Sequence, residues 1–528
     1  MLSAFYNCNK MEGTIPTPHE KTFENVTQFN SMFAGCSKLT GSIPENLFVN
    51  ATKATAFGYA FSGCSGLTGS IPARLFADSV NADEFYGTFY ECTGLTGSIP
   101  ESLFNACLKV TRMECAFYGC TGLTGSIPER LFANNPEVWA VRAIFSECSG
   151  LTGSIPEKLF MNNPKIKDFS GTFQKCSGLT GSIPERLFVN NPKADDFKFL
   201  FEECTGLTGS IPEKLFVSCK SVDCFEYVFY NCTGLTGSIP EKLFANNRWA
   251  TTFGSAFKGC NGLTGSIPEK LFAYNLSALG FDSTFSGCSG LTGNIPEVLF
   301  ANNTNVTHLN YTFEYCTGLT GEIPERLFVN NVDVIYFSYV FIGCSGLTGE
   351  IPEGLFIENE NVINIGGAFS GCSGLTGNIP ENLFEKNINI ESFDYIFSGC
   401  IGLTGNIPEG LFANNLNAQR FDSAFERCAG LTGSIPADLF ANNPNVISFS
   451  GVFWDCSGLT GSIPETLFDN CKEVKSFDRM FINCTGLEGE ALELWDTTRW
   501  PKVTNGDFCY RGCSQLTNYS VIPASWRA

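Results

Sequence analysis

Apolar and polar residues follow one another along this chain in a pattern with a 28-residue period. Counted from a recurring cysteine, apolar residues stand at positions −10, −7, −3 and 0, as at Val446, Phe449, Phe453 and Cys456. Gaps of three, four and three follow one face of a helix, so the pattern predicts a short helix before each cysteine. A glycine two residues after the cysteine, present in every repeat from Gly66 to Gly486, is typical of a helix that ends in a left-handed residue.

The segment after this glycine has a period of two. Residues 67–72 read Leu-Thr-Gly-Ser-Ile-Pro, which predicts a short strand with Leu67 and Ile71 inward and Thr68 and Ser70 outward. An inward Gly69 would leave room for a bulky side chain from the helical side of the coil. The proline ends the strand and is favoured at the first position of a further turn of helix, and an Asn-Asn bend follows.

The period itself indicates the architecture. The cysteines keep this 28-residue spacing without a break from Cys8 to Cys484, and Cys513 comes one position later than the spacing predicts. A fixed period of this length is typical of stacked supersecondary units, none of which buries enough apolar surface to fold alone. We therefore expect an α/β solenoid of about 19 coils, each with a short parallel β-strand plus short helical segments.

The two ends of the chain differ from the repeat. Phe5 and Cys8 already occupy repeat positions, so either an upstream segment is missing or the first coil is uncapped. The segment Leu487-Glu-Gly-Glu-Ala lacks the Ile-Pro pair that follows Leu-x-Gly in the repeats, and residues 488–528 contain three of the six tryptophans. We expect a solenoid over residues 1–487 and an atypical capping repeat over residues 488–528, because the terminal units of solenoids must close the core.

Two segments of the repeat resemble known families. The Phe-x-x-Cys-x-x-Leu segment, with its short strand and Val-x-x-Phe entry, resembles the repeats of BspA-like bacterial surface proteins, and Leu-Thr-Gly-x-Ile-Pro-x-x-Leu is similar to plant-type leucine-rich repeats. The resemblance implies a leucine-rich-repeat-like solenoid with a parallel sheet on its concave face. It also implies adhesion or binding at a cell surface, with no catalytic residues. The chain carries cysteine where the plant repeats usually have an asparagine ladder.

Composition narrows the possible partners. A formal net charge of −20 argues against nucleic acid, whose binding surfaces concentrate Lys and Arg. No apolar run approaches the roughly 18 residues of a membrane span. Nineteen of the 25 cysteines form the ladder, which we interpret as a stack of buried thiols, with disulfides or zinc between rungs as alternatives. The other six are Cys107, Cys115, Cys219, Cys224, Cys471 and Cys509.

Candidate chemistry is sparse. The two histidines, His19 and His308, lie in unrelated repeats, so no pair of nucleophile and base can be assembled, and no phosphate-binding loop is present. We therefore expect no enzyme activity, no cofactor and no metal site.

Two surfaces are candidates for binding. One consists of the outward hydroxyl columns, namely Thr68, Ser70, Thr96, Ser98, Thr124, Ser126, Thr152, Ser154, Thr180, Ser182, Thr208 and Ser210. The other consists of irregular residues expected in the bend and on the outward helix positions, namely Trp139, Arg142, Arg248, Trp249, Tyr274 and Tyr336. Exposed aromatic residues in otherwise regular loops are typical contact sites.

These observations predict a non-enzymatic, extracellular or cell-surface solenoid that binds a protein or glycan, as an adhesin or interaction scaffold. One alternative is a structural protein that assembles with other copies of itself, as a filament, sheath or virus fibre subunit. A second alternative is ice binding, because parallel ranks of hydroxyl groups could order water.

Overall fold

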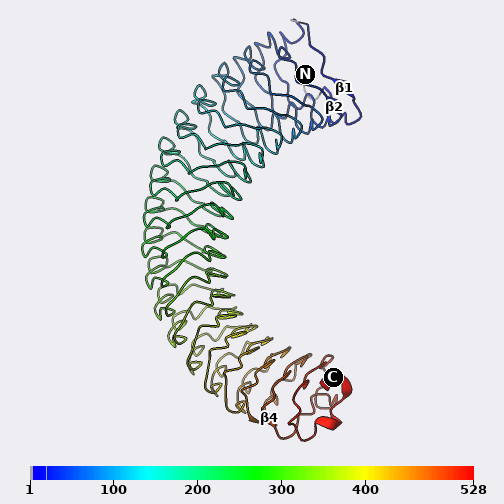
Figure 1. Cartoon of the computed structure of the whole chain (residues 1–528), viewed down its shortest axis with the longest axis vertical. Helices are drawn as coiled ribbons and strands as arrows, with labels where there is room; N and C mark the ends of the chain where they lie inside the picture. Colours follow the sequence, from blue (N-terminus) through cyan, green and yellow to red (C-terminus); the bar gives the residue numbers. More distant parts are fainter. Residues whose placement is uncertain (1–3, 20) are drawn as a thin grey trace. The chain divides into compact units, whose positions relative to one another are not determined.

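The computed structural model describes residues 4–19 and 21–528, so the predicted start of the solenoid at residue 1 lies outside the described residues. The chain divides into two compact units, unit 1 at Met1–Thr264 and unit 2 at Gly265–Ala528. Each unit is a succession of coils in which equivalent residues of consecutive repeats lie side by side (Figure 1). The number of coils stays a prediction.

The first ladder of parallel pairing lies where the sequence predicts a strand. In unit 1, β1 (Gly13–Thr14) pairs in parallel with β2 (Leu39–Thr40), and in unit 2, β3 (Gly461–Ser462) pairs with β4 (Leu487–Glu488). In the coils of unit 1 that follow β2 and the coils of unit 2 that precede β3, this pairing is reduced to single bridges, such as Gly97 with Leu123. Parallel strand pairing is therefore confirmed, although it is short.

A second parallel ladder runs through position −8 of each coil. Its bridges extend from Gln28 to Thr252 in unit 1 and from Gly280 to Asn505 in unit 2. The sequence pattern misses this ladder because position −8 holds residues as different as Arg112, Asp168 and Thr252, so no alternation marks it.

The predicted helices before each cysteine are wrong. Among the described residues the helices are η1 (Tyr519–Val521) and α1 (Ala524–Arg527), both near the end of unit 2. In the repeats from Cys64 to Cys484, the four inward positions are buried as expected, but turns connect them. The expected α/β class with helical segments in each coil is therefore corrected to coils of short parallel pairings and turns.

The coil at residues 393–400 shows why no helix forms. The amides of Phe393, Tyr395, Phe397 and Gly399 donate to carbonyls of the following coil, with N···O distances of 2.7 to 3.0 Å. The amides of Ile396, Ser398 and Cys400 close turns onto residues three positions back, as from Ile396 to Phe393. Tyr395 and Gly399 have φ of 58° and 73°, which a right-handed helix cannot accommodate. The gaps of three and four thus come from consecutive turns.

The roles predicted for the two glycines are also wrong. Gly178, two residues after the cysteine, does not have positive φ, and a Cβ there would lie 2.4 Å from the Leu151 carbonyl oxygen of the preceding coil. Gly181, within Leu-Thr-Gly, is the left-handed residue, with φ of 78°. Its Cβ would meet Ser154 rather than a phenylalanine, so it makes no room for a bulky core side chain.

The core of each unit consists of columns of stacked side chains. Phenylalanine rings at position −3 lie nearly parallel, as for Phe61 and Phe89 in unit 1 (centroids 5.5 Å apart) and Phe369 and Phe397 in unit 2 (5.8 Å). These rings are fully buried. Offset stacking of this kind adds to the hydrophobic stabilisation of the stack.

Two polar ladders accompany the aromatic columns. Each ladder thiol from Cys36 onward that has a described contact donates to a phenylalanine carbonyl of the preceding coil, as Cys204 does to Phe173 at 2.9 Å. The second asparagine of the bend is also buried and donates from Nδ2, as Asn163 does to the Asn135 oxygen at 2.8 Å. The repeat therefore has an asparagine ladder in addition to the cysteine ladder.

The cysteine outliers follow from these ladders. All 25 cysteines are free thiols. Cys107, Cys219 and Cys471 occupy positions of the asparagine ladder and are fully buried. Cys8 is exposed, whereas Cys115 and Cys224 are half-buried at outward positions of the second ladder and its adjoining turn.

Two large aromatic side chains are buried in the C-terminal segment of unit 2. Trp500 is buried and packs edge-on against Phe477, with ring centroids 5.5 Å apart. The Tyr510 hydroxyl, also buried, donates to the Leu492 carbonyl oxygen at 2.8 Å. Both aromatic side chains therefore extend the buried core into this segment.

Candidate binding face

The structure places the predicted hydroxyl columns on the surface. All twelve Thr and Ser residues from Thr68 to Ser210 are exposed and lie in two parallel columns of unit 1. The backbone amide of each threonine is held by the preceding coil, as Thr180 N donates to Gly153 O at 2.8 Å. The columns therefore present small, nearly identical side chains on a fixed backbone.

The six irregular residues fall into two groups. Arg248, Trp249 and Tyr274 lie in the bend and are exposed, as expected. Trp139, Arg142 and Tyr336 stand at positions −9, −6 and −8, so they belong to the second ladder and the turn after it, not to a loop or a helix. The structure thus joins this second group to a surface that the sequence analysis did not identify.

We define the variable face as the outward positions −9, −8, −6, −5, −2 and −1 of each coil. Twelve of the 15 tyrosines occupy it. Those in unit 1 are Tyr6, Tyr59, Tyr86, Tyr90, Tyr118, Tyr227 and Tyr230, and those in unit 2 are Tyr311, Tyr315, Tyr336, Tyr339 and Tyr395. The sequence contains this signal, which becomes visible when tyrosines are sorted by their position relative to the cysteine.

In unit 1 one arginine of this face lies near two aromatic rings, one of them a tyrosine. The Arg112 guanidinium carbon lies 5.1 Å from the centroid of the Tyr86 ring and 6.0 Å from that of Trp139. The same guanidinium donates two hydrogen bonds of 3.0 Å to Glu114, whose side chain is buried. The arginine is therefore fixed between aromatic rings and a carboxylate.

Neighbouring tyrosines stack along the coils. The rings of Tyr90 and Tyr118 lie 4.7 Å apart and almost parallel. Burial, together with nearby Glu147, raises the pKa of Tyr118 to about 12. Its hydroxyl is thus a hydrogen-bond donor at neutral pH.

The later coils of unit 1 carry carboxylates at the same positions. Burial raises the pKa of Asp195, and the like charge of Asp223 adds to this, whereas Lys167 lowers it. Burial likewise raises the pKa of Asp196, although the amide of Lys198 donates to its Oδ1 at 2.8 Å. This part of the variable face therefore brings several carboxylates together, beside Lys167 and Lys198.

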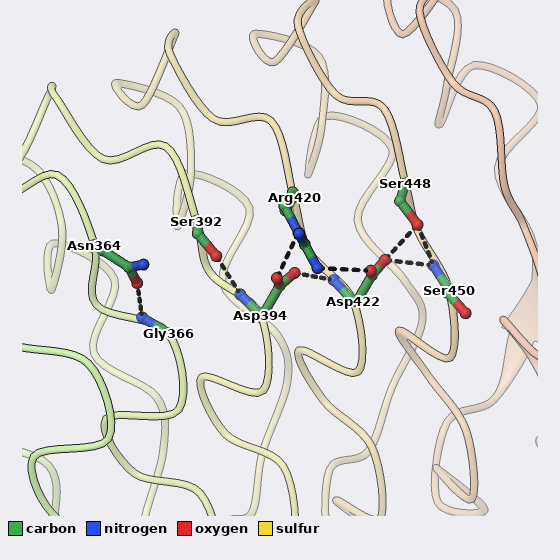
Figure 2. A network of polar contacts seen from close by, with 8 residues as sticks. All are labelled: Asn364, Gly366, Ser392, Asp394, Arg420, Asp422, Ser448 and Ser450. Carbon is green, nitrogen blue, oxygen red and sulfur yellow. Dashed lines mark hydrogen bonds and ion pairs between the residues drawn. The ribbon is translucent and has the colours of Figure 1, made fainter. Parts of the chain in front are cut away.

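In unit 2 a polar network crosses three adjacent coils of the variable face. Figure 2 shows Arg420 between Asp394 and Asp422, with Nε 2.6 Å from Asp394 Oδ2 and Nη2 3.5 Å from Asp422 Oδ2. Asp394 Oδ1 also accepts the backbone amide of Asp422 at 2.8 Å, and Asp422 Oδ1 accepts that of Ser450 at 2.9 Å. Each carboxylate therefore ties its coil to the next one.

The electrostatics of this network fit a structural role. Asp394 is only 8% exposed. Burial raises its pKa, neighbouring Asp422 raises it further, and Arg420 lowers it. The half-exposed arginine thus compensates two carboxylates and leaves one edge of its guanidinium at the surface.

Within the described ranges there is neither a cluster of metal-binding side chains nor a membrane-spanning helix. No cluster of three or more His, Cys, Asp or Glu side chains there is arranged to hold a metal ion. Over the same residues, no helix has the length and apolar character needed to cross a membrane.

Comparisons with known proteins concern mainly the fold. Residues 1–130 and 414–518 match a family described as Mycoplasma protein of unknown function, DUF285. No curated protein matches the chain. The chain is similar to a solved plant peptide hormone receptor, RGFR1 in complex with RGF2, with 20% identity, coverage of 94% of this chain and 71% of the receptor chain, and a TM-score of 0.52.

Two further solved structures are similar. A TDR receptor shows 20% identity over 94% of this chain and 78% of its own, with a TM-score of 0.49. A leucine-rich repeat protein from Bacteroides ovatus ATCC 8483 shows 19% identity over 83% of this chain and 90% of its own, with a TM-score of 0.42. The likeness to RGFR1 supports a leucine-rich-repeat-like solenoid, and the BspA-like relationship stays a prediction.

Proposed function

We propose that this chain is a non-enzymatic binding solenoid that holds a protein ligand on its variable face. The observation that carries the proposal is the concentration of tyrosines, 12 of 15, on this one face. Tyrosine supplies a large contact area at a low cost in side-chain entropy, together with a hydroxyl for hydrogen bonds. The plant peptide hormone receptor of similar fold, RGFR1, is in complex with RGF2, which is in keeping with such a role.

The tyrosines are held ready for contact by their neighbours. Tyr311 and Tyr339 stack with centroids 5.0 Å apart. The next coil carries Gly367 at the equivalent position, and a Cβ there would lie 2.1 Å from the Tyr339 ring. Rings that are already fixed lose little freedom when a ligand binds, so more of the contact energy contributes to affinity.

The residue types on the variable face also vary more than those in the hydroxyl columns. From coil to coil it changes among aromatic, cationic, acidic and small residues, whereas the columns repeat Thr and Ser. A specific ligand requires differences between contacts, and only the variable face supplies them. The exposed hydroxyl columns favour a second candidate, an extended repetitive ligand such as a glycan, or ice.

The cellular location, the possibility of self-assembly and the domain division are also proposals. We place the chain outside the cell or at its surface, as an adhesin or interaction scaffold, with self-assembly into a filament as the alternative. We also propose the division into a solenoid at residues 1–487 and a capping repeat at residues 488–528, in which Trp500 and Tyr510 close the core.

The test uses the full chain and a phage-displayed library of random linear peptides. Individual selected peptides are measured by biolayer interferometry against the unmodified chain, Tyr339→Ala, and the hydroxyl-column variant Thr348→Ala as a control. We expect at least about tenfold weaker binding to Tyr339→Ala for peptides that contact this part of the face, and no change for Thr348→Ala. Peptides that depend on Thr348 and ignore a panel of tyrosine variants would contradict the proposal.

A further inference from the structure

A groove runs over several coils of unit 2 at the edge of the variable face. Its volume is about 560 Å³, and we call it the unit 2 groove. Its floor comes from position −9 and one wall from position −11. It is lined by Thr307, Asp333, Ile335, Asn361, Ile363, Asn389, Glu391 and Asn417.

The floor of the groove is apolar where an outward position is usually polar. Ile335 and Ile363 occupy adjacent rungs, linked by a hydrogen bond of 2.9 Å from Ile363 N to Ile335 O, and both are only half-buried. The same position in unit 1 holds residues such as Thr111, Lys167 and Asp195. Adjacent isoleucines facing water mark a contact site, because their burial requires a partner.

The wall of the groove presents a row of oriented hydrogen-bond acceptors. Asn361 Nδ2 donates to Val332 O at 3.2 Å, Asn389 Nδ2 to Glu360 O at 3.1 Å, and Asn417 Nδ2 to Ile388 O at 3.4 Å. Only the amide nitrogen can donate to a carbonyl, so these contacts fix which side-chain atom is anchored. The remaining oxygen of each exposed asparagine is an acceptor for donors of a bound chain.

The charge of the groove is of one sign. Asp333 and Glu391 are its ionisable lining residues, and no Lys or Arg lines it. Position −11 in unit 1 differs, because it carries Lys53, Lys109 and Lys165. An occupant of the unit 2 groove must therefore be neutral or basic where it passes Asp333 and Glu391.

We propose that the unit 2 groove takes an extended polypeptide segment with apolar side chains over Ile335 and Ile363 and a Lys or Arg beside Glu391 or Asp333. Backbone N–H groups of the segment donate to the asparagine wall. An extended chain suits the groove because its N–H groups are free, and its alternate side chains point toward the floor. This inference rests on the proposed function and specifies the ligand class for one part of the face.

The experiment selects random linear peptides on the unmodified full chain and measures each one against three variants. Ile363→Glu places a charge on the floor, Glu391→Lys reverses the charge at one end, and Ile401→Glu is the matched control. Ile401 is an exposed isoleucine of the same unit, 58% exposed, outside the groove. Urea unfolding of each variant shows whether it keeps its fold.

We expect peptides that combine apolar and basic residues, with binding weakened at least about tenfold by Ile363→Glu and by Glu391→Lys but not by Ile401→Glu. Acidic analogues of the same peptides should regain binding to Glu391→Lys. Peptides that lose binding to Tyr339→Ala yet ignore both groove variants would overturn this inference and leave the proposed function standing. Enrichment of acidic peptides, or equal effects of all three variants, would also overturn it.

Discussion

The glycine two residues after each ladder cysteine from Cys64 to Cys484 lies close against the backbone of the preceding coil, and Gly178→Ala tests this directly. A Cβ at Gly178 would lie 2.4 Å from Leu151 O and 2.5 Å from Ser149 O, both backbone atoms of the preceding coil. Since real Cβ contacts essentially never fall below 3.0 Å, the two coils must separate by about 0.6 Å. No side-chain rotation relieves this clash.

The cost follows from what the separation breaks. The nearest bond between the coils, from Thr180 N to Gly153 O at 2.8 Å, would stretch beyond useful length, which costs about 1 kcal/mol. Apolar contacts across the opened interface lose a quarter or more of their attraction. Together with strain, we expect a loss of about 3 kcal/mol in the free energy of unfolding.

The assay is urea unfolding followed by circular dichroism, combined with hydrogen exchange at the Thr180 amide. Because each coil contacts only its neighbours, exchange should accelerate near residues 149–153 and 177–181 and change little in distant coils. Gly410→Ala is the matched control, because a Cβ at Gly410 meets nothing within 4 Å and its φ is not positive. We expect it to be neutral or slightly stabilising.

A third variant separates close approach from backbone conformation. If Gly178 were a left-handed helix stop, Gly178→Asn would be tolerated, since asparagine adopts that conformation readily. A clash with the neighbouring backbone predicts instead that Gly178→Asn is as damaging as Gly178→Ala. Equal unfolding midpoints for Gly178→Ala and Gly410→Ala would refute the reasoning.

Three further predictions concern the two polar ladders and the Arg420 network. Burial raises the pKa of Cys176 to about 12, so the stability that this thiol contributes is complete below its unfolded pKa of 9.0 and is lost as pH rises toward 12. Between about pH 8 and 10.5, the urea midpoint should therefore fall less for Cys176→Ser than for the unmodified chain. Equal falls in the two proteins would contradict this prediction. Asn163→Ala removes two hydrogen bonds, from Asn163 Nδ2 to Phe132 O and to Asn135 O, and should cost about 2 kcal/mol in urea unfolding. Asn163→Cys should cost less, because cysteine already fills this ladder at three positions, and equal losses would count against the ladder's role. Arg420→Ala leaves two carboxylates uncompensated and should cost about 1 kcal/mol in thermal unfolding. Arg427 has longer and more exposed contacts, so Arg427→Ala should change stability by less than about 0.5 kcal/mol. The reverse order would show that the network contributes little.

The candidate site was only partly predictable from the sequence. Trp139, Arg142 and Tyr336 stand out as irregular residues, but the pattern assigns them to loops or helices, because nothing local reveals a second ladder at position −8. The tyrosine-rich face emerges only when residues in different coils are compared at equal positions. The unit 2 groove could be identified only in the structure, because its floor and its wall come from two different repeat positions, −9 and −11, in several coils.

The sequence by itself determined the 28-residue coil, the buried columns such as Val446, Phe449, Phe453 and Cys456, and the outward Thr and Ser columns. These features depend on which residues avoid water, and that is written in their chemistry. Only the tertiary structure decided how the backbone connects them. Amides such as those of Tyr395 and Gly399 bond to the next coil, a whole repeat further along the chain, and a periodicity of three and four therefore becomes a series of turns instead of a helix.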